Sequence, residues 1–309
     1  DTGIDWDHED FRGAANSSNS RIRYIWDQTI SPQGNEQDPA QRGGSDLSGF
    51  DYGVEYSKSD IESAFGTTGN VRTEDVDGHG THVAGTAVST GGAHPDQKYQ
   101  GMAPEANLIV VKAGNGSFPF SNVIDGMNYC GEVAEDENKP VVVNMSLGTP
   151  AGPHDGTSPQ AQAIDSFVGN GKVAVVSAGN DGNSGMHYQS TLSAGSSTSF
   201  DFSIGSYTAQ SGAGNDDAAF DIWFNTADDV SVTVTSPNGE VVSQGAGGQT
   251  TSNTPDGAVY ISNQVNNVNN DRHVEIRVFD QNASETPVSG RWSVEFTDQS
   301  GSGNSFHSW

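Results

Sequence analysis

The sequence predicts an α/β domain, with a parallel sheet covered by helices on both faces, followed by an all-β sandwich of the jelly-roll type. Before residue 186, unbroken runs of valine and isoleucine alternate with helical patterns. From residue 187 the chain is rich in Gly, Ser, Thr and Asn and carries short alternating strands. This change of composition divides the chain into a first domain, 1–186, and a second domain, 187–309.

Three apolar runs predict the buried strands of the first domain, at 107–112, 140–145 and 172–177. Helical spacing of apolar residues predicts helices over 121–138 and 158–170 between them. Strands that are apolar throughout, separated by helices, indicate a parallel sheet with both faces covered. In such sheets, functional sites gather outside the carboxyl ends of the strands.

Residues 12–70 are polar and do not repeat this pattern, so we expect a long surface insertion there. Within it, Arg21–Trp26 alternates between polar and apolar residues and predicts an edge strand. Ser59–Glu62 has the spacing of a capping box and predicts the start of a short helix.

The second domain contains several short strands bounded by turn residues, which is the pattern of a β-sandwich or jelly roll. Pro237–Gly239 is a strong turn signal between two of them. The clearest predicted strands are 199–204, 219–224, 230–234, 273–278 and 292–296.

The charge of the chain excludes some classes of partner. Lys and Arg total 13 against 40 Asp and Glu, a net charge of −27. Such a surface repels nucleic acids and anionic membranes, and no apolar run approaches the roughly 20 residues of a membrane span. We expect a secreted or extracytoplasmic protein. An acidic surface also suits a saline environment, with an ordinary acidic secreted protein as the alternative.

Cys130 is the single cysteine, so the sequence allows no intrachain disulfide. It falls in an apolar helical pattern near Met127. We therefore expect a small buried hydrophobic side chain rather than a nucleophile.

Three short segments carry residues suited to catalysis: Asp1–Asp5, Asp77–Thr86 and Ser177–Asn180. Each has an ordinary alternative when taken singly. Asp-Thr-Gly is a common turn and also the nucleophile motif of aspartic proteases, the glycines around His79 suit any helix start, and Ser-Ala-Gly-Asn suits a loop cap. Together, in this order, they are far more specific.

With these motifs, residues 1–186 resemble the subtilisin-like serine protease (subtilase) family. The longest match is Gly78–Thr86, and Gly101–Pro104 and Asn144–Gly148 are also typical of the family. The order Asp, then His, then Ser is the one that subtilisin has. The resemblance implies an endopeptidase that acts on extended polypeptides through an acyl-enzyme.

The resemblance also implies the role of each site residue. Asp1 would orient the histidine, His79 would act as general base and then acid, and Asn180 would donate its side-chain amide to the oxyanion. The substrate would pair with two backbone segments. These segments consist of Ser146, Leu147 and Gly148 on one side of the groove, and Gly114, Asn115 and Gly116 on the other.

The nucleophilic serine of the family is not found in its usual context. The one Gly-Thr-Ser, at Gly156–Ser158, precedes Asn180 and is followed by Pro-Gln. We interpret Ser158 as the N-cap of the next helix. The β-rich domain is then an insertion in a subtilase, and the serine is expected in a C-terminal part of the catalytic domain that lies beyond Trp309. Without that part we predict no turnover.

The chemistry needs no cofactor. The family often binds structural calcium near its start, and Asp10 falls on the matching carboxylate, so Asp10 is a candidate calcium ligand. His79 and His82 have helical spacing, but no Glu between them supports a zinc protease, and His82 is expected to be a packed or hydrogen-bonded structural residue. Two other functions remain open: a protease-like protein that only binds, and a β-sandwich recognition module for glycans or proteins.

Overall fold

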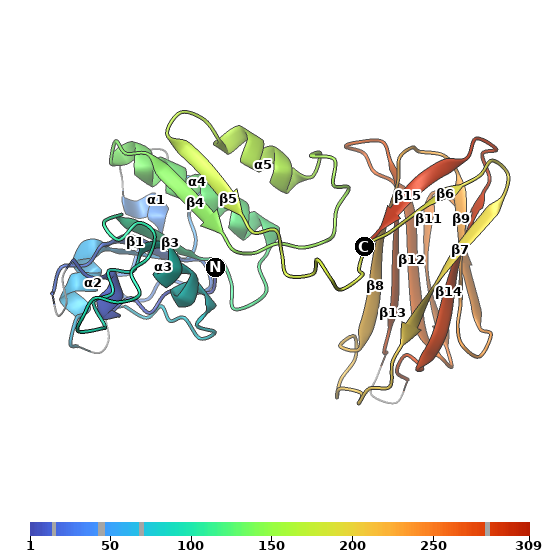
Figure 1. Cartoon of the computed structure of the whole chain (residues 1–309), viewed down its shortest axis with the longest axis horizontal. Coiled ribbons are helices and arrows are strands. Elements are labelled where there is room, and N and C mark those ends of the chain that lie inside the picture. Colours follow the sequence, from blue (N-terminus) through green and yellow to red (C-terminus); the bar gives the residue numbers. More distant parts are fainter. Residues whose placement is uncertain (14–16, 43–46, 68–70, 282–284) are drawn as a thin grey trace. The chain divides into compact units, whose positions relative to one another are not determined.

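The computed structural model describes residues 1–13, 17–42, 47–67, 71–281 and 285–309. Parts of the predicted insertion over 12–70 lie outside these ranges. The chain forms two compact units (Figure 1). The first, called here the α/β unit, comprises Asp1–Gly148 and Pro159–Gly179. The second, called the sandwich unit, comprises Thr149–Ser158 and Asn180–Trp309.

The α/β unit contains all the helices that the structure describes, together with five strands. In chain order its elements are η1 (Glu9–Phe11), β1 (Ile22–Asp27), α1 (Pro39–Arg42), β2 (Val54–Ser57), α2 (Lys58–Ala64), α3 (His79–Val88), β3 (Leu108–Lys112), α4 (Phe120–Asp136), β4 (Val141–Met145), α5 (Pro159–Phe167) and β5 (Lys172–Val176). The strands β3, β4 and β5 and the helices α4 and α5 lie where the apolar pattern predicts them.

The strands of this unit form two small sheets rather than the single parallel sheet expected from the sequence. One sheet has the order β2-β1-β3, in which β1 and β3 are parallel and β2 is antiparallel. The other is the parallel pair β4-β5. Among the described residues β3 and β4 do not pair, so each has a free edge.

The strand β1 lies in the middle of its sheet, so its assignment to an edge was wrong. Its side chains Ile22, Ile25 and Trp26 are fully buried, and this part of the chain is therefore core rather than surface. The indole of Trp26 donates to the carbonyl of Tyr52 (2.9 Å). The two faces of β1 pack into two different apolar clusters, Ile25 into one and Trp26 into the other, so neither face is left to solvent.

The capping box of α2 begins two residues earlier than the sequence indicated. Ser57 is the N-cap: its hydroxyl accepts from the backbone N–H of Asp60, whose carboxylate accepts from the N–H of Ser57. Glu62 lies inside the helix, where it pairs with Lys58 and accepts from the N–H of Ser20. Two overlapping Ser-x-x-acid patterns compete here, and the structure uses the first.

The free edges of β3 and β4 line an apolar cavity of about 650 Å³, which α3 and α4 also line. Helices α4 and α5 pack on one face of β4-β5 through Met127, Met145 and Phe167. The opposite face of this pair leaves Val142, Val173 and Val175 between 46 and 65% exposed. The α/β unit therefore has an uncovered apolar sheet face as well as a cavity between its sheets.

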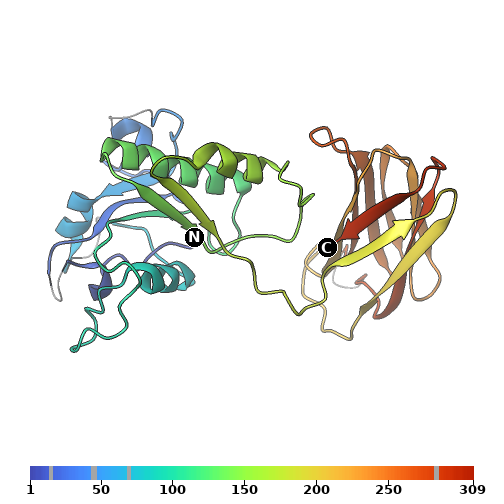
Figure 2. The ribbon, with the colours of Figure 1, turned by 45° about the horizontal axis from the view of Figure 1, so that its top comes forward.

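The sandwich unit is built from two antiparallel sheets (Figure 2). One has the order β10-β9-β14-β7 and the other β11-β12-β13-β8-β15-β6. The strands are β6 (Tyr188–Leu192), β7 (Ser197–Ile204), β8 (Asp217–Phe224), β9 (Val230–Thr235), β10 (Val241–Gln244), β11 (Gly248–Thr254), β12 (Gly257–Val265), β13 (Arg272–Phe279), β14 (Gly290–Asp298) and β15 (Asn304–Ser308).

Buried residues that alternate with less buried ones, strictly along β9 and β13 and over most of β12 and β14, supply the core between the sheets. Side chains from both sheets meet there, among them Ile222 and Ile276 from one and Val232 and Trp292 from the other. This is the packing expected for two sheets that each have one apolar face.

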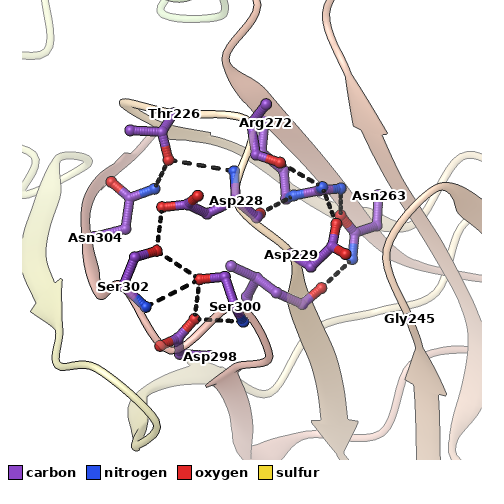
Figure 3. Close-up of polar contacts among 12 residues, drawn as sticks. Thr226, Asp228, Asp229, Gly245, Asn263, Arg272, Asp298, Ser300, Ser302 and Asn304 are labelled. Carbon is purple, nitrogen blue, oxygen red and sulfur yellow. Dashed lines mark hydrogen bonds and ion pairs between the residues drawn. The ribbon is translucent and has the colours of Figure 1, made fainter.

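A buried arginine organises the loops at one end of the sandwich (Figure 3). Arg272 is 2% exposed. Its guanidinium donates to the carbonyls of Ala227 and Asp228, to Oδ1 of Asn263 and to the carboxylate of Asp229. Three of these acceptors belong to the loop before β9, and the fourth, Asn263 of β12, itself donates to the carbonyl of Val230, so this cluster has a structural role.

Candidate active site

The N-terminal residues of the chain pack across the start of α3. Gly78 is the N-cap of this helix and has φ +85°, a conformation that favours glycine. A Cβ on Gly80 would lie 2.1 Å from the carbonyl oxygen of Gly3. Glycine at position 80 is therefore what allows Asp1–Gly3 to approach the helix so closely.

This approach brings Asp1 and His79 together. Oδ1 of Asp1 lies 2.8 Å from Nδ1 of His79, the first residue of α3. The backbone N–H of Thr2 donates to the same carboxylate oxygen (2.7 Å), which fixes its direction. The Asp1 side chain is 19% exposed and the His79 side chain 49% exposed. Since Nδ1 faces the carboxylate, Nε2 is the nitrogen left for a reacting group.

Asp75 is a further residue of this site that the sequence did not reveal. Its carboxylate accepts from the hydroxyl and N–H of Thr81 (2.6 and 2.8 Å), from the hydroxyl of Thr2 (2.7 Å) and from the N–H of Gly78 (3.0 Å). Burial acts to raise the pKa of Asp75, but these hydrogen bonds outweigh it and the pKa is lowered. Asp75 thus ties the Asp1 segment to the helix that presents His79.

The signal for Asp75 was present but ambiguous. An acidic residue shortly before a helix start suits the unsatisfied N–H groups of the first turn. Asp77 is closer in sequence to the helix and satisfies the same pattern, yet it is exposed. Only the three-dimensional path of residues 75–81 distinguishes the two.

The two predicted substrate segments follow the carboxyl ends of β4 and β3. Ser146 and Leu147 line the same cavity as Asp1. Nδ2 of Asn144 donates to the hydroxyl of Ser146 (3.0 Å), and the hydroxyl of Ser177 donates to the carbonyl of Leu147 (3.3 Å). Gly148, the last residue of the first stretch of the α/β unit, is exposed.

The second segment forms a tight turn after β3. A Cβ on Gly114 would lie 2.0 Å from the carbonyl oxygen of Ser117, and Gly116 has φ +103°. Asn115 and Gly116 are exposed. Both segments present backbone at the strand ends, while their pairing with a peptide stays a prediction.

Asn180 is the first residue of the second stretch of the sandwich unit, and it follows Gly179, which has φ +83°. The side chain of Asn180 is exposed. The meeting of its amide with the Asp1–His79 pair stays a prediction. His82, which we expected to be a packed or hydrogen-bonded structural residue, is exposed one turn along α3 and is therefore not packed.

Asp10 joins η1 to the loop after α3. Its Oδ1 accepts from the N–H of Ala93 (2.8 Å), and its carbonyl accepts from the N–H and hydroxyl of Thr90. The described residues contain no group of three or more His, Cys, Asp or Glu arranged to hold a metal ion. Calcium prefers six to eight oxygen ligands, so calcium at Asp10 stays a prediction that rests on one carboxylate.

Cys130 is buried in α4 and lines the cavity between the sheets. Burial raises the pKa of its thiol to about 12. The thiolate is therefore scarce at neutral pH, and Cys130 behaves as the small apolar side chain that we expected.

Comparison with known proteins agrees with this geometry. The profile of the subtilase family (Peptidase_S8) matches residues 1–286. The serine protease AprX of Bacillus subtilis (strain 168) is 38% identical over 138 residues, covering 41% of this chain and 31% of AprX. Subtilisin DY of Bacillus licheniformis is 33% identical over 141 residues, covering 44% of this chain and 47% of subtilisin DY. This chain thus covers less than half the length of either relative.

A solved structure extends the likeness to the whole chain. The CspB protease of Clostridium perfringens superposes with a TM-score of 0.77 and 26% identity, over 100% of this chain and 61% of that protein. In the described residues no helix is long and apolar enough to cross a membrane. With a family profile that matches most of its length, this chain belongs to the subtilase family.

Proposed function

We propose that this chain carries the acid–base part of a serine endopeptidase that cleaves extended polypeptides. Membership in the subtilase family supports a serine protease function. The observation that carries the proposal is the 2.8 Å contact between Oδ1 of Asp1 and Nδ1 of His79. The carboxylate selects the imidazole tautomer that bears its proton on Nδ1, and so leaves Nε2 free to accept one.

The surroundings of His79 fit a base that later becomes an acid. His79 is the first residue of α3, where the helix dipole disfavours a cation. Asp1 offsets this cost when Nε2 takes the proton of a serine hydroxyl. The imidazolium can then return that proton to the leaving amine, after which water repeats the cycle on the acyl-enzyme.

We further propose that the peptide lies between Ser146–Gly148 and Gly114–Gly116, and that Asn180 donates to the oxyanion. Support for the first segment is that Ser146 and Leu147 share a cavity with Asp1. In subtilisin the corresponding amide is worth about 2.7–4 kcal/mol of transition-state stabilisation.

The nucleophilic serine is proposed to come from further polypeptide that packs on the α/β unit. The exposed valines of β4 and β5 and the free edges of β3 and β4 support this, because large apolar surfaces and unpaired strand edges are normally covered. On this view the 309-residue chain alone has no turnover. Ser158 directly precedes α5, as an N-cap residue would.

We also propose an extracytoplasmic location, with the sandwich as an insertion in the catalytic domain. The family alone does not fix the compartment. The relatives of this chain include the major intracellular serine protease of Bacillus subtilis (strain 168), which is 40% identical over 114 residues. Fractionation of cells that make the protein is the direct measurement.

The test uses a fluorophosphonate probe, which labels an activated serine covalently. We expect no stable labelling of the 309-residue chain, and labelling of the longest natural polypeptide that contains it. In that longer protein Asp1→Asn should lower kcat by about 10⁴-fold, since the histidine would take the wrong tautomer. The exposed Asp77→Asn is the matched control and should change kcat by about twofold or less.

Two outcomes would overturn parts of the proposal. Labelling of the isolated chain would show that it holds its own nucleophile. Failure to label the longer polypeptide, with Asp1 and His79 intact, would favour a protease-like protein that only binds.

A further inference from the structure

Four of the eight histidines of the chain lie in the sandwich unit, at 154, 187, 273 and 307. Three of them stack with Trp309. The ring of His154 lies 4.0 Å from that of Trp309, the ring of His187 5.0 Å and the ring of His307 5.6 Å, with interplanar angles of 14, 26 and 15°. We call His154, His187, His307 and Trp309 the histidine–tryptophan patch.

The patch also contains a hydrogen bond between two imidazoles. Nε2 of His187 lies 3.0 Å from Nδ1 of His307, with the rings nearly parallel at 11°. One of these nitrogens must donate and the other must accept, so the bond requires at least one neutral ring. When both rings are protonated, the bond is replaced by repulsion between two cations.

The patch holds one end of the loop 149–158 against the sandwich. His154 is the loop residue that stacks on Trp309, and its Nε2 lies 2.7 Å from the carbonyl of Pro150. Two other contacts hold the same loop. The N–H of Gly152 donates to Oδ2 of Asp221 (2.6 Å), and Nδ2 of Asn269 donates to Oδ2 of Asp155 (2.9 Å).

The titratable groups around the patch come from β8, β13, the turn before β13 and the loop itself. On β15, His307 is paired with Trp223 of β8, which is in turn paired with His273 of β13. Oδ1 of Asp221 lies 2.5 Å from Nε2 of His273. The other acidic groups are Glu275, which is the strand partner of Asp221, and Asp271 and Asp155, which both contact Asn269.

These groups respond differently to acid. Burial, His187 and His154 lower the pKa of His307, so folding is favoured by its neutral form. Burial acts to raise the pKa of Asp221, but hydrogen bonds from His273, Gly152 and Trp223 outweigh it and the pKa is lowered. Asp221 therefore stays ionised, and continues to accept from the N–H of Gly152, while acid converts His307 to the form that folding disfavours.

Because folding lowers the pKa of His307, the direction in which pH changes the stability of the patch can be worked out. A histidine whose pKa is lower in the folded state contributes stability above its ordinary value of about 6.5. That contribution is lost as the pH falls through the lowered value. The weakening therefore occurs on the acid side of about pH 6.5.

We propose that the histidine–tryptophan patch is an acid-sensitive clasp that holds the His154 end of loop 149–158 at neutral pH and releases it on acidification. The loop remains attached through the contacts of Gly152 with Asp221 and of Asp155 with Asn269. The loop begins directly after Gly148, which the proposed function assigns to substrate binding. If the chain is a protease as proposed, acid therefore loosens the loop next to the substrate-binding segment Ser146–Gly148.

Hydrogen–deuterium exchange of the 309-residue chain tests the clasp without any need for protease activity. We compare amide protection of residues 154–158 at about pH 7.5 and about pH 5, after correction for intrinsic exchange rates. We expect protection to fall about fivefold or more in acid, while the core strand β9 keeps its protection. Equal protection of 154–158 at both values overturns the proposal, whether or not the protein is a protease.

Variants identify the groups that carry the effect. His187→Gln combined with His307→Gln leaves amides in place of the rings and removes their charge, so protection should depend much less on pH. His154→Phe keeps a ring to stack on Trp309 and should reduce the dependence of amide protection on pH. His94→Gln, in the exposed loop after α3, is the matched control and should behave as wild type. A double variant that retains the full pH dependence would rule out the clasp.

Discussion

The sandwich unit buries its apolar side chains more completely than the α/β unit does. In the sandwich, sixteen large apolar residues from both sheets form one cluster in which each is less than 7% exposed. The α/β unit divides its buried residues among three smaller clusters and leaves the valines on one face of β4-β5 about half exposed. The sandwich closes its core between its own two sheets, whereas the described residues of the α/β unit leave one sheet face exposed and the edges of β3 and β4 unpaired.

The difference also appears in how the units use polar groups. The sandwich uses buried Arg272 to satisfy its own loop carbonyls. The α/β unit uses Asp75, Thr2 and Thr81 to bring Asp1 to His79, a histidine half exposed to solvent. One unit is built chiefly for stability, and the other holds polar groups in place around an open site.

The largest effect should come from the sandwich core. Phe296 is fully buried and its ring packs 4.9 Å from that of Phe306 and 5.2 Å from that of Phe224. Phe296→Ala should destabilise the sandwich by about 3–5 kcal/mol, because it leaves a cavity among rigid rings. Calorimetry should show one transition at lower temperature and the transition of the α/β unit unchanged.

Val268→Ala is the control for this experiment, since Val268 lies in the same unit and is 60% exposed. It should change stability by about 0.5 kcal/mol or less. A parallel shift of both transitions by Phe296→Ala would show that the two units unfold cooperatively. This result would contradict the view that each unit is stabilised by its own core.

Removal of the buried arginine should have the next largest effect. Arg272→Met keeps the length of the side chain but leaves the carbonyls of Ala227 and Asp228 without their donor. We expect a loss of about 2–4 kcal/mol, mostly from these unsatisfied acceptors, because Asp229 is largely exposed and can be solvated. Urea unfolding of the sandwich unit measures this loss of unfolding free energy.

Arg277→Met is the matched variant on the same strand. Arg277 pairs with Asp217 at a side-chain exposure of 40 and 37%, and its loss should cost less than about 1 kcal/mol. Equal costs for the two arginines would contradict the structural role given to Arg272.

The sequence was sufficient where neighbouring residues determine the outcome. The valine runs predicted β3, β4 and β5, because a strand that is apolar throughout suits only a buried position. The glycine that follows His79 in its motif is the one that lets the carbonyl of Gly3 approach the helix. The motifs around Asp1 and His79 identified the family that the profile match confirms.

The sequence was insufficient where contacts between residues far apart in the chain determine the structure. The apolar pattern of β1 could not show that β1 lies between β2 and β3, because these two strands, at 54–57 and 108–112, are distant from it in the sequence. Asp75 was hidden because its partners include Thr2, 73 positions away. The histidine–tryptophan patch joins residues from 154 to 309, and nothing near any one of them indicates the others.

The smallest predicted effect separates the acid responses of the two units. In the α/β unit, hydrogen bonds from Arg72 and Tyr56 hold the pKa of Glu36 at about 2. A carboxyl whose pKa is lowered by folding contributes stability above its ordinary pKa and loses it as the pH falls toward the lowered value. Glu36→Gln should therefore cost about 1 kcal/mol at neutral pH and little at about pH 2, with intermediate values between about pH 4.5 and pH 2.

The sandwich provides an internal reference for this measurement. Hydrogen bonds from Ser300 and from the N–H of Gly195 hold the pKa of Asp298 at about 2 as well, so wild type loses stability in both units as acid is added. Glu36→Gln should flatten only the pH dependence of the α/β transition, while the exposed Glu105→Gln should leave both slopes as in wild type. If Glu36→Gln altered the sandwich transition to the same extent, the acid response would belong to the whole chain, and the two units would share the stability that their separate cores suggest they hold independently.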